Sequence, residues 1–174
     1  ANLARAGQQT FTLAVESGSE RLRRSMNKAL SETDLEAAVR RLSRAGISNL
    51  KIYLMFGLPG EQNADLEDSV RLVAAIQEWL LSAQRGRGRT GRLTVSINPF
   101  VPKPHTPFAQ EPMPPLGELK RRRGILAGEL RRPGGLQVSG AYPREAILQC
   151  LLARVDERRA VLLLAANVAW PPSP

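Results

Sequence analysis

Cysteine, histidine and long apolar runs are scarce in this sequence of 174 residues. Cys150 is the only cysteine, so no disulfide can form within the chain, and a lone thiol cannot hold a metal cluster. The cytoplasm is therefore the expected compartment. The longest apolar runs, such as 160–166, are too short to span a membrane, and we expect no membrane partner. His105 is the only histidine, and it lacks the neighbours that would complete a catalytic or metal site.

Acidic residues are outnumbered, with 25 Lys+Arg against 16 Asp+Glu and a net charge of +9. This balance is compatible with an acidic or nucleic-acid substrate. Basic residues cluster at 85–92, 120–123 and 131–132, where they could contact phosphates. Aromatic residues make up only 5% of the chain and do not interleave with these clusters. Base stacking is therefore not favoured, and solvated basic faces are the simpler interpretation.

The pattern of apolar residues predicts strands that alternate with helices. Ser31 and Asp34 have the spacing of a capping box, and Asn63 is expected to cap the helix that follows it. The proline-rich stretch 99–115 should lack regular structure. Strands are predicted at 10–16, 49–56, 93–98 and 136–139, and helices at 19–26, from Ser31 to Gly46, from Asn63 to the loop at 85–92, and at 116–132, 143–154 and 157–167.

This alternation predicts an α/β fold with parallel strands, and three main strands are too few to close a barrel. The chain should then form half of a barrel, whose sheet edges need partners. Because the first residue is not Met and falls within a domain-like pattern, we expect a fragment of a longer protein. The expected organisation is a barrel portion at 1–140, a helical extension at 141–168 and a disordered tail at 169–174.

Two predicted strands end in short loops built from small residues. The first loop, Glu16–Ser19, offers a carboxylate to an ammonium group or to ribose hydroxyls, although Ser17 or Ser19 could equally cap a helix. The second loop is Gly57-Leu58-Pro59-Gly60, followed by Glu61. Its glycines would let an adenine ring approach the backbone. The same residues are equally typical of an ordinary strand-to-helix turn without a ligand.

Taken together, these motifs resemble the C-terminal half of a radical S-adenosylmethionine (SAM) enzyme, in particular members that often carry an upstream cobalamin-binding domain. Residues 14–23 read AVESGSERLR and are followed by Asn27-Lys28, which is similar to a strand end of that group. Residues 50–61 resemble its LKLYFMIGLPGE segment, and 98–108 resemble NPFVPKPHTPF. Residues 148–154 are similar to its later LQALLSR element. The resemblance covers roughly residues 8–160.

The resemblance implies the C-terminal part of a partial (β/α)6 TIM-like barrel with a helical C-terminal extension. It also implies that a [4Fe-4S] cluster and an electron donor cleave SAM reductively to a 5′-deoxyadenosyl radical. Cobalamin would sit in an upstream domain. Glu61 is expected to order its loop rather than to contact SAM. The residues that the resemblance places around SAM are Glu16, Ser17, Gly18, Ser19, Gly57, Leu58, Pro59, Gly60, Val101 and Pro102.

The sequence departs from the family at the cluster motif, Cys-x3-Cys-x2-Cys, which it lacks. Val15 also stands where proline is usual, and Val155-Asp156 replaces Gly-Asp. This chain alone is therefore expected to be inactive and to need the missing N-terminal half of the barrel, from the same gene or from a separate chain. Two alternatives remain open: a basic RNA-binding or scaffolding module, and a degenerate SAM-related domain without catalysis.

Overall fold

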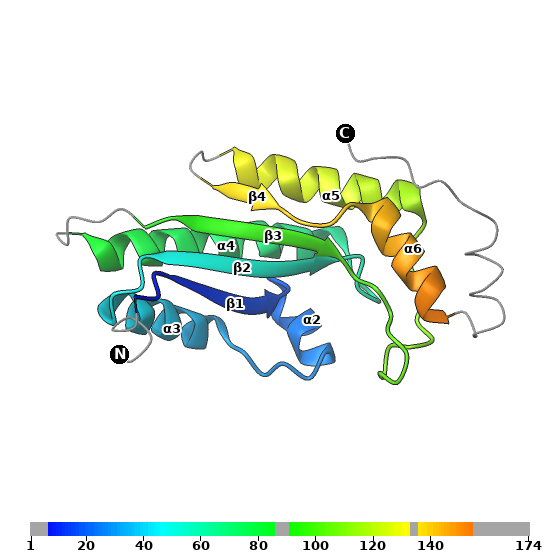
Figure 1. Ribbon diagram of the computed structural model, residues 1–174, viewed down its shortest axis with the longest axis horizontal. Helices are drawn as coiled ribbons and strands as arrows, with labels where there is room; N and C mark the ends of the chain where they lie inside the picture. Colours follow the sequence, from blue (N-terminus) through cyan, green and yellow to red (C-terminus); the bar gives the residue numbers. More distant parts are fainter. Residues whose placement is uncertain (1–6, 86–90, 133–135, 155–174) are drawn as a thin grey trace.

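A computed structural model describes residues 7–85, 91–132 and 136–154 of the chain. Strands and helices alternate through most of this part, as Figure 1 shows. The elements in chain order are β1 (Thr10–Glu16), α2 (Glu20–Ser25), α3 (Glu32–Arg44), β2 (Asn49–Phe56), α4 (Asn63–Gln84), β3 (Leu93–Pro99), α5 (Leu116–Arg131), β4 (Gln137–Ser139) and α6 (Pro143–Arg154).

The strands form one parallel sheet in the order β1-β2-β3-β4, so each strand lies beside its neighbour in sequence. This order is that of consecutive strands in a β/α barrel. In the described residues β1 and β4 are the two edges of the sheet, and the barrel is not closed. The fold is therefore α/β and agrees with the expected part of a TIM-like barrel.

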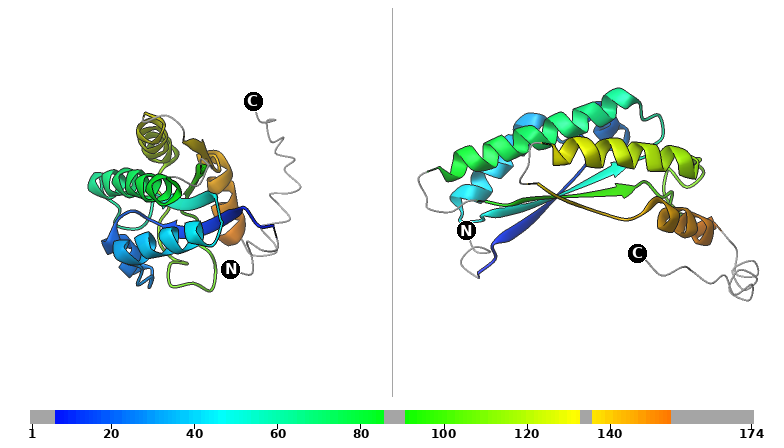
Figure 2. Two further views of the ribbon diagram at one scale, coloured as in Figure 1. Left: turned by 90° about the vertical axis from the view of Figure 1, so that its left-hand side faces the viewer. Right: turned by 90° about the horizontal axis from the view of Figure 1, so that it is seen from above.

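Helices α3, α4 and α5 lie on one face of the sheet, while α6 lies beyond the carboxyl ends of the strands (Figures 1 and 2). Alternate residues of β2, namely Leu50, Ile52, Leu54 and Phe56, point into the helix layer and are at most 1% exposed. Burying such side chains is the main stabilising contribution to a core of this kind, at roughly 1.5–3 kcal/mol each. The other residues of β2 face away from the helices.

Apart from α6 near its carboxyl end, no helix of the described residues lies on that second face (Figure 2). Ser96 of β3 is buried there. Thr12 and Ala14 of β1 are exposed there, and Lys51 and Tyr53 of β2 are half-buried. Parallel sheets are normally covered on both faces, because a helix layer or the interior of a closed barrel packs against each. In a barrel this face would be the inner one.

Most predicted element bounds agree with the structure to within one or two residues. The capping box of Ser31 and Asp34 is present, and Cys150 is buried on α6. The prediction for α4 was wrong by one residue: Gln62 rather than Asn63 is the N-cap, because its side chain and Asp65 form the reciprocal cap. The helix at 157–167 and the tail at 169–174 lie outside the described residues. No helix within the described ranges is long and apolar enough to cross a membrane.

Candidate ligand site at the carboxyl ends of β1 and β2

The two motif loops follow neighbouring parallel strands, and both therefore lie at the carboxyl edge of the sheet. Glu16 ends β1, and Phe56, the last residue of β2, leads into Gly57. Both Glu16 and Gly57 have left-handed backbone conformations, with φ values of 69° and 77°. Such a conformation strains a residue with a side chain, and strained residues of this kind concentrate at functional sites.

Glu16 is held by a lysine from the turn after α2. Lys28 Nζ lies 2.7 Å from Glu16 Oε1 and also donates a hydrogen bond to the Ala14 carbonyl at 3.1 Å. The register between β1 and β2 shifts between Ala14 and Glu16, which marks an irregularity at the end of the strand. The Glu16 side chain keeps 21% of its surface exposed. Its carboxylate is therefore fixed in direction and still reachable from solvent.

The rest of the first loop is used mainly for packing. Ser17 and Ser19 are 1% and 2% exposed, and the Ser19 N–H donates to Ser17 Oγ. A Cβ at Gly18 would lie only 2.1 Å from the Ser69 Cα of α4, and the Gly18 N–H donates to Ser69 Oγ. Glycine is thus required by the close approach of α4. The expectation that both serines face SAM stays a prediction.

The buried guanidinium of Arg23 holds the backbone of the Glu16–Ser19 loop. Arg23 is 1% exposed and donates to the carbonyls of Ser17 and Gly18 at 2.9 and 2.8 Å, and to Leu30. A buried arginine is stable only when its donors are paired, as these are. Although Ser19 is the N-cap residue of α2, its side chain makes no cap hydrogen bond to the helix backbone, so the plain capping interpretation is incomplete.

The second loop turns sharply and is closed by Glu61. The Gly57 N–H donates to Glu61 Oε2 at 2.7 Å, and the Glu61 N–H donates to the Leu58 carbonyl. A Cβ at Gly57 would meet Leu119 of α5 at 2.7 Å. The expectation that Glu61 orders this loop is confirmed by these contacts.

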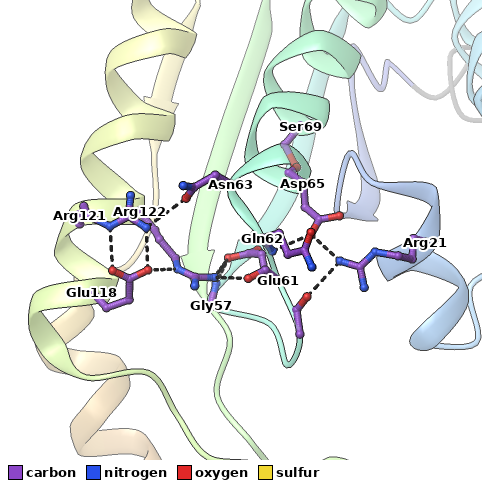
Figure 3. Close-up of polar contacts among 11 residues, drawn as sticks. Arg21, Gly57, Glu61, Gln62, Asn63, Asp65, Ser69, Glu118, Arg121 and Arg122 are labelled. Atoms are coloured by element: carbon purple, nitrogen blue, oxygen red, sulfur yellow. Dashed lines mark hydrogen bonds and ion pairs between the residues drawn. The ribbon is translucent and has the colours of Figure 1, made fainter.

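Arg122 of α5 completes this arrangement, as Figure 3 shows. Its guanidinium lies 2.5 Å from Glu61 Oε2, with only 15% and 2% of the two side chains exposed. It also pairs with Glu118, whose pKa is lowered to about 2 by hydrogen bonds from Arg121 and Arg122. Burial raises the pKa of the Glu61 carboxyl above its ordinary value, although Gly57 and Arg122 oppose that rise.

On its other side the loop is held by α2. Arg21 donates to the Gly60 carbonyl at 3.0 Å and lies 2.5 Å from Asp65 Oδ2 (Figure 3). Burial would raise the pKa of Asp65, but hydrogen bonds from Ser19, the Gln62 N–H and Arg21 outweigh it and hold that pKa below its ordinary value. The Gly57–Gly60 loop is therefore braced by an ion pair on each side.

An apolar cluster lies beside this loop. Leu58 is 4% exposed and packs with Leu22 of α2 and with Phe100, which follows β3. The Phe100 N–H donates to the Phe56 carbonyl at 2.8 Å and so continues the pairing of β2 and β3 beyond the strands. Val101 is half-buried and Pro102 is buried, whereas Pro59 is half-buried and Gly60 is exposed. The side chain of Leu58 thus belongs to this cluster, which leaves the loop backbone as the surface for a ligand.

No cluster of three or more His, Cys, Asp or Glu side chains suited to a metal occurs among the described residues. Cys150, the one cysteine of the sequence, is buried on α6. A [4Fe-4S] cluster needs several thiolates, so the residues of this chain do not fit one.

The fold defines a class: a portion of a β/α barrel, a fold whose ligands bind at the carboxyl edge of the sheet. Comparison with known proteins adds a family likeness. Residues 1–73 match the model of the radical SAM superfamily. An uncharacterized protein of Methanocaldococcus jannaschii is 32% identical over 150 residues, which make up 86% of this chain and 31% of that protein. The chain therefore spans about a third of the length of this curated relative.

Two features of the site were not predicted from the sequence. Arg122 was included in a basic cluster that was interpreted as a solvated face, and Arg21 was not singled out beyond the family motif. Arg121 and Arg122 are instead paired with carboxylates, which weakens the hypothesis of phosphate contact at 120–123. A sequence signal exists for one part of this network: Glu118 lies three and four residues before Arg121 and Arg122, a spacing that favours ion pairs on a helix.

Proposed function

We propose that this chain is the SAM-binding part of a radical SAM enzyme, with Glu16 and the backbone of Gly57–Gly60 contacting SAM. The observation that carries the proposal is the pair of left-handed residues, Glu16 and Gly57, at the ends of adjacent parallel strands. Ligands of β/α barrels bind at this edge. The family match over residues 1–73 includes both loops, which supports the assignment.

Each proposed contact follows from the chemistry of its residue. The Glu16 carboxylate can accept hydrogen bonds from ribose hydroxyls or from the ammonium of SAM. Lys28 would then keep its ion pair with the other carboxylate oxygen of Glu16 or be displaced from it. The missing Cβ of Gly57 makes room for Leu119 of α5, whereas Gly60 is exposed and a Cβ there would meet nothing closer than Arg21 at 4.0 Å. A flat adenine could therefore lie against the backbone at Gly60, with Pro59, Val101 and Pro102 nearby. Because Ser17 and Ser19 are buried, we assign them and Gly18 to the shape of the loop around the ligand.

The reductive cleavage of SAM belongs, in this proposal, to a longer protein. Its cluster would be ligated by cysteines outside this sequence, and an electron donor would reduce it. The open edges at β1 and β4 are where further strands of the barrel would pair, from the same chain or another, and the second face of the sheet would then line the interior. The proposal gives no residue of this chain a contact with cobalamin.

Equilibrium binding of SAM to the full natural protein tests the proposal. Glu16→Gln keeps the shape of the side chain and removes its charge. We expect it to weaken SAM affinity about tenfold or more, since a hydrogen bond to a charged group contributes about 1.5–3 kcal/mol. Glu20→Gln is the matched control, because Glu20 is an exposed residue of α2 that pairs with Arg24. Equal SAM affinity in the wild type and in Glu16→Gln would remove the basis of the proposal.

A further inference from the structure

The second face of the sheet carries a cation on β2. Lys51 points to this face from β2, and its Nζ lies 4.9 Å from the centroid of the Tyr53 ring. The two residues are two positions apart on the strand and therefore share this face. The ammonium lies against the Tyr53 ring.

Short side chains flank Tyr53 in the register of the sheet. Tyr53 lies between Ala14 of β1 and Ser96 of β3, and Ser96 in turn pairs with Ser139 of β4. Ala14 is exposed, whereas Ser96 is 5% exposed and its Oγ accepts a hydrogen bond from Asn98 Nδ2 at 3.2 Å. The open side of Lys51 and Tyr53 is therefore the side toward β1.

No carboxylate balances this charge within the described residues. Lys51 forms none of the ion pairs found there, and the Glu16 carboxylate is engaged by Lys28. In the register Lys51 pairs with Thr12 and Thr94, neither of which is charged. A cation enclosed in a barrel is stable only when negative charge or strong hydrogen-bond acceptors accompany it. Whatever occupies this face must therefore bring an anionic group.

We infer that Lys51 and Tyr53 form a subsite for an anionic oxygen group of the substrate, a carboxylate or a phosphate. The inference rests on the proposed function, because only then does this face line the chamber next to SAM. Tyr53 precedes Gly57 by four residues, or roughly 13 Å of extended strand. The anionic group would thus mark the end of the substrate that lies away from SAM.

Lysine methyl resonances in the full natural protein test the subsite directly. The lysines are reductively methylated with a carbon-13 label, which keeps their charge, and the Lys51 signal is identified by its loss in Lys51→Arg. Inorganic phosphate and succinate are then titrated at constant ionic strength. We expect the Lys51 signal to shift and saturate, and the exposed Lys103 to shift by less than about a fifth as much at the same anion concentration. Tyr53→Phe, which removes one hydroxyl, should weaken the response about threefold or more.

Two results would overturn the inference. In the first, the chemical shifts of Lys51 and Lys103 change by the same amount during the titration, which would indicate ionic screening without binding at Lys51. In the second, Lys51 does not respond to either anion, and Lys51→Met lowers the midpoint of thermal unfolding where Lys51→Arg does not. A carboxylate of the protein then pairs with Lys51. SAM binding in the Glu16→Gln experiment is independent of both readouts, so failure of the proposed function and failure of the subsite are distinguishable.

Discussion

Replacing Arg122 by methionine tests whether the Gly57–Gly60 loop depends on the helix that packs over it. The change keeps much of the aliphatic stem and removes the guanidinium. Glu61, with 2% of its side chain exposed, then loses its ion-pair partner and keeps the Gly57 N–H as a hydrogen-bond donor. Removing one partner of a buried ion pair leaves an uncompensated charge and costs about 3–5 kcal/mol.

We expect a value near the lower end of that range, about 3 kcal/mol, because the Gly57 N–H still stabilises the carboxylate. For a protein of this size each kcal/mol lowers the midpoint of thermal unfolding by about 2–4 °C, which gives a decrease of about 6–12 °C. SAM affinity should fall as well, since the loop that the ion pair holds is the proposed adenine contact. Thermal unfolding and SAM binding in the full natural protein measure the two effects.

Arg121→Met is the matched control for this experiment. Arg121 is the neighbouring residue and pairs with the same Glu118, but 45% and 30% of the two side chains are exposed. An exposed pair of this kind contributes about 0–1 kcal/mol. Equal destabilisation by Arg121→Met and Arg122→Met would refute the reasoning, and so would loss of stability in Arg122→Met with SAM affinity unchanged.

Two further predictions concern the same loops. Burial raises the pKa of Glu61 above its ordinary value of 4.5. The stability that Glu61 contributes is therefore fully present below pH 4.5 and is lost as the pH rises through the pKa of the folded state. Urea unfolding at several pH values should show that Glu61→Gln lacks this decline, and the same pH profile in the wild type and in Glu61→Gln would contradict the prediction. Gly18→Ala forces a Cβ to 2.1 Å from the Ser69 Cα and should destabilise the protein by about 2 kcal/mol or more, whereas Gly124→Ala meets nothing within 4 Å and should stabilise α5 by about 0.5–1 kcal/mol. Similar midpoints of unfolding for the two alanine variants would count against the close approach of α4.

Local patterns in the sequence predicted what depends on neighbours along the chain. The capping box of Ser31 and Asp34 involves residues three apart, and the alternation in β2 involves residues two apart. These two features could be inferred because backbone hydrogen bonding and burial follow the helical and strand periods directly. The loop-ordering role of Glu61 was expected from the family resemblance and not from a periodic pattern.

The remaining contacts join residues that are distant in sequence. Arg122 reaches Glu61 across 61 positions, and Gly18 donates to Ser69 across 51. No periodicity identifies which arginine of a basic run will meet a buried carboxylate, since the choice depends on how α5 packs against the end of β2. The burial of Ser17 and Ser19 has the same origin, because it is caused by α4 and Arg23 and not by their own segment.

The contacts that hold the second loop extend beyond the segment that matches the family model. The superfamily model covers residues 1–73, which include both loops and the ion pair of Arg21 with Asp65. Arg122, Leu119 and Phe100, which hold the second loop from the other side, all lie beyond residue 73. The matched segment therefore supplies the loops but only part of what holds them in place. A substitution in α5 should accordingly change the ligand loop even though α5 lies outside the family match.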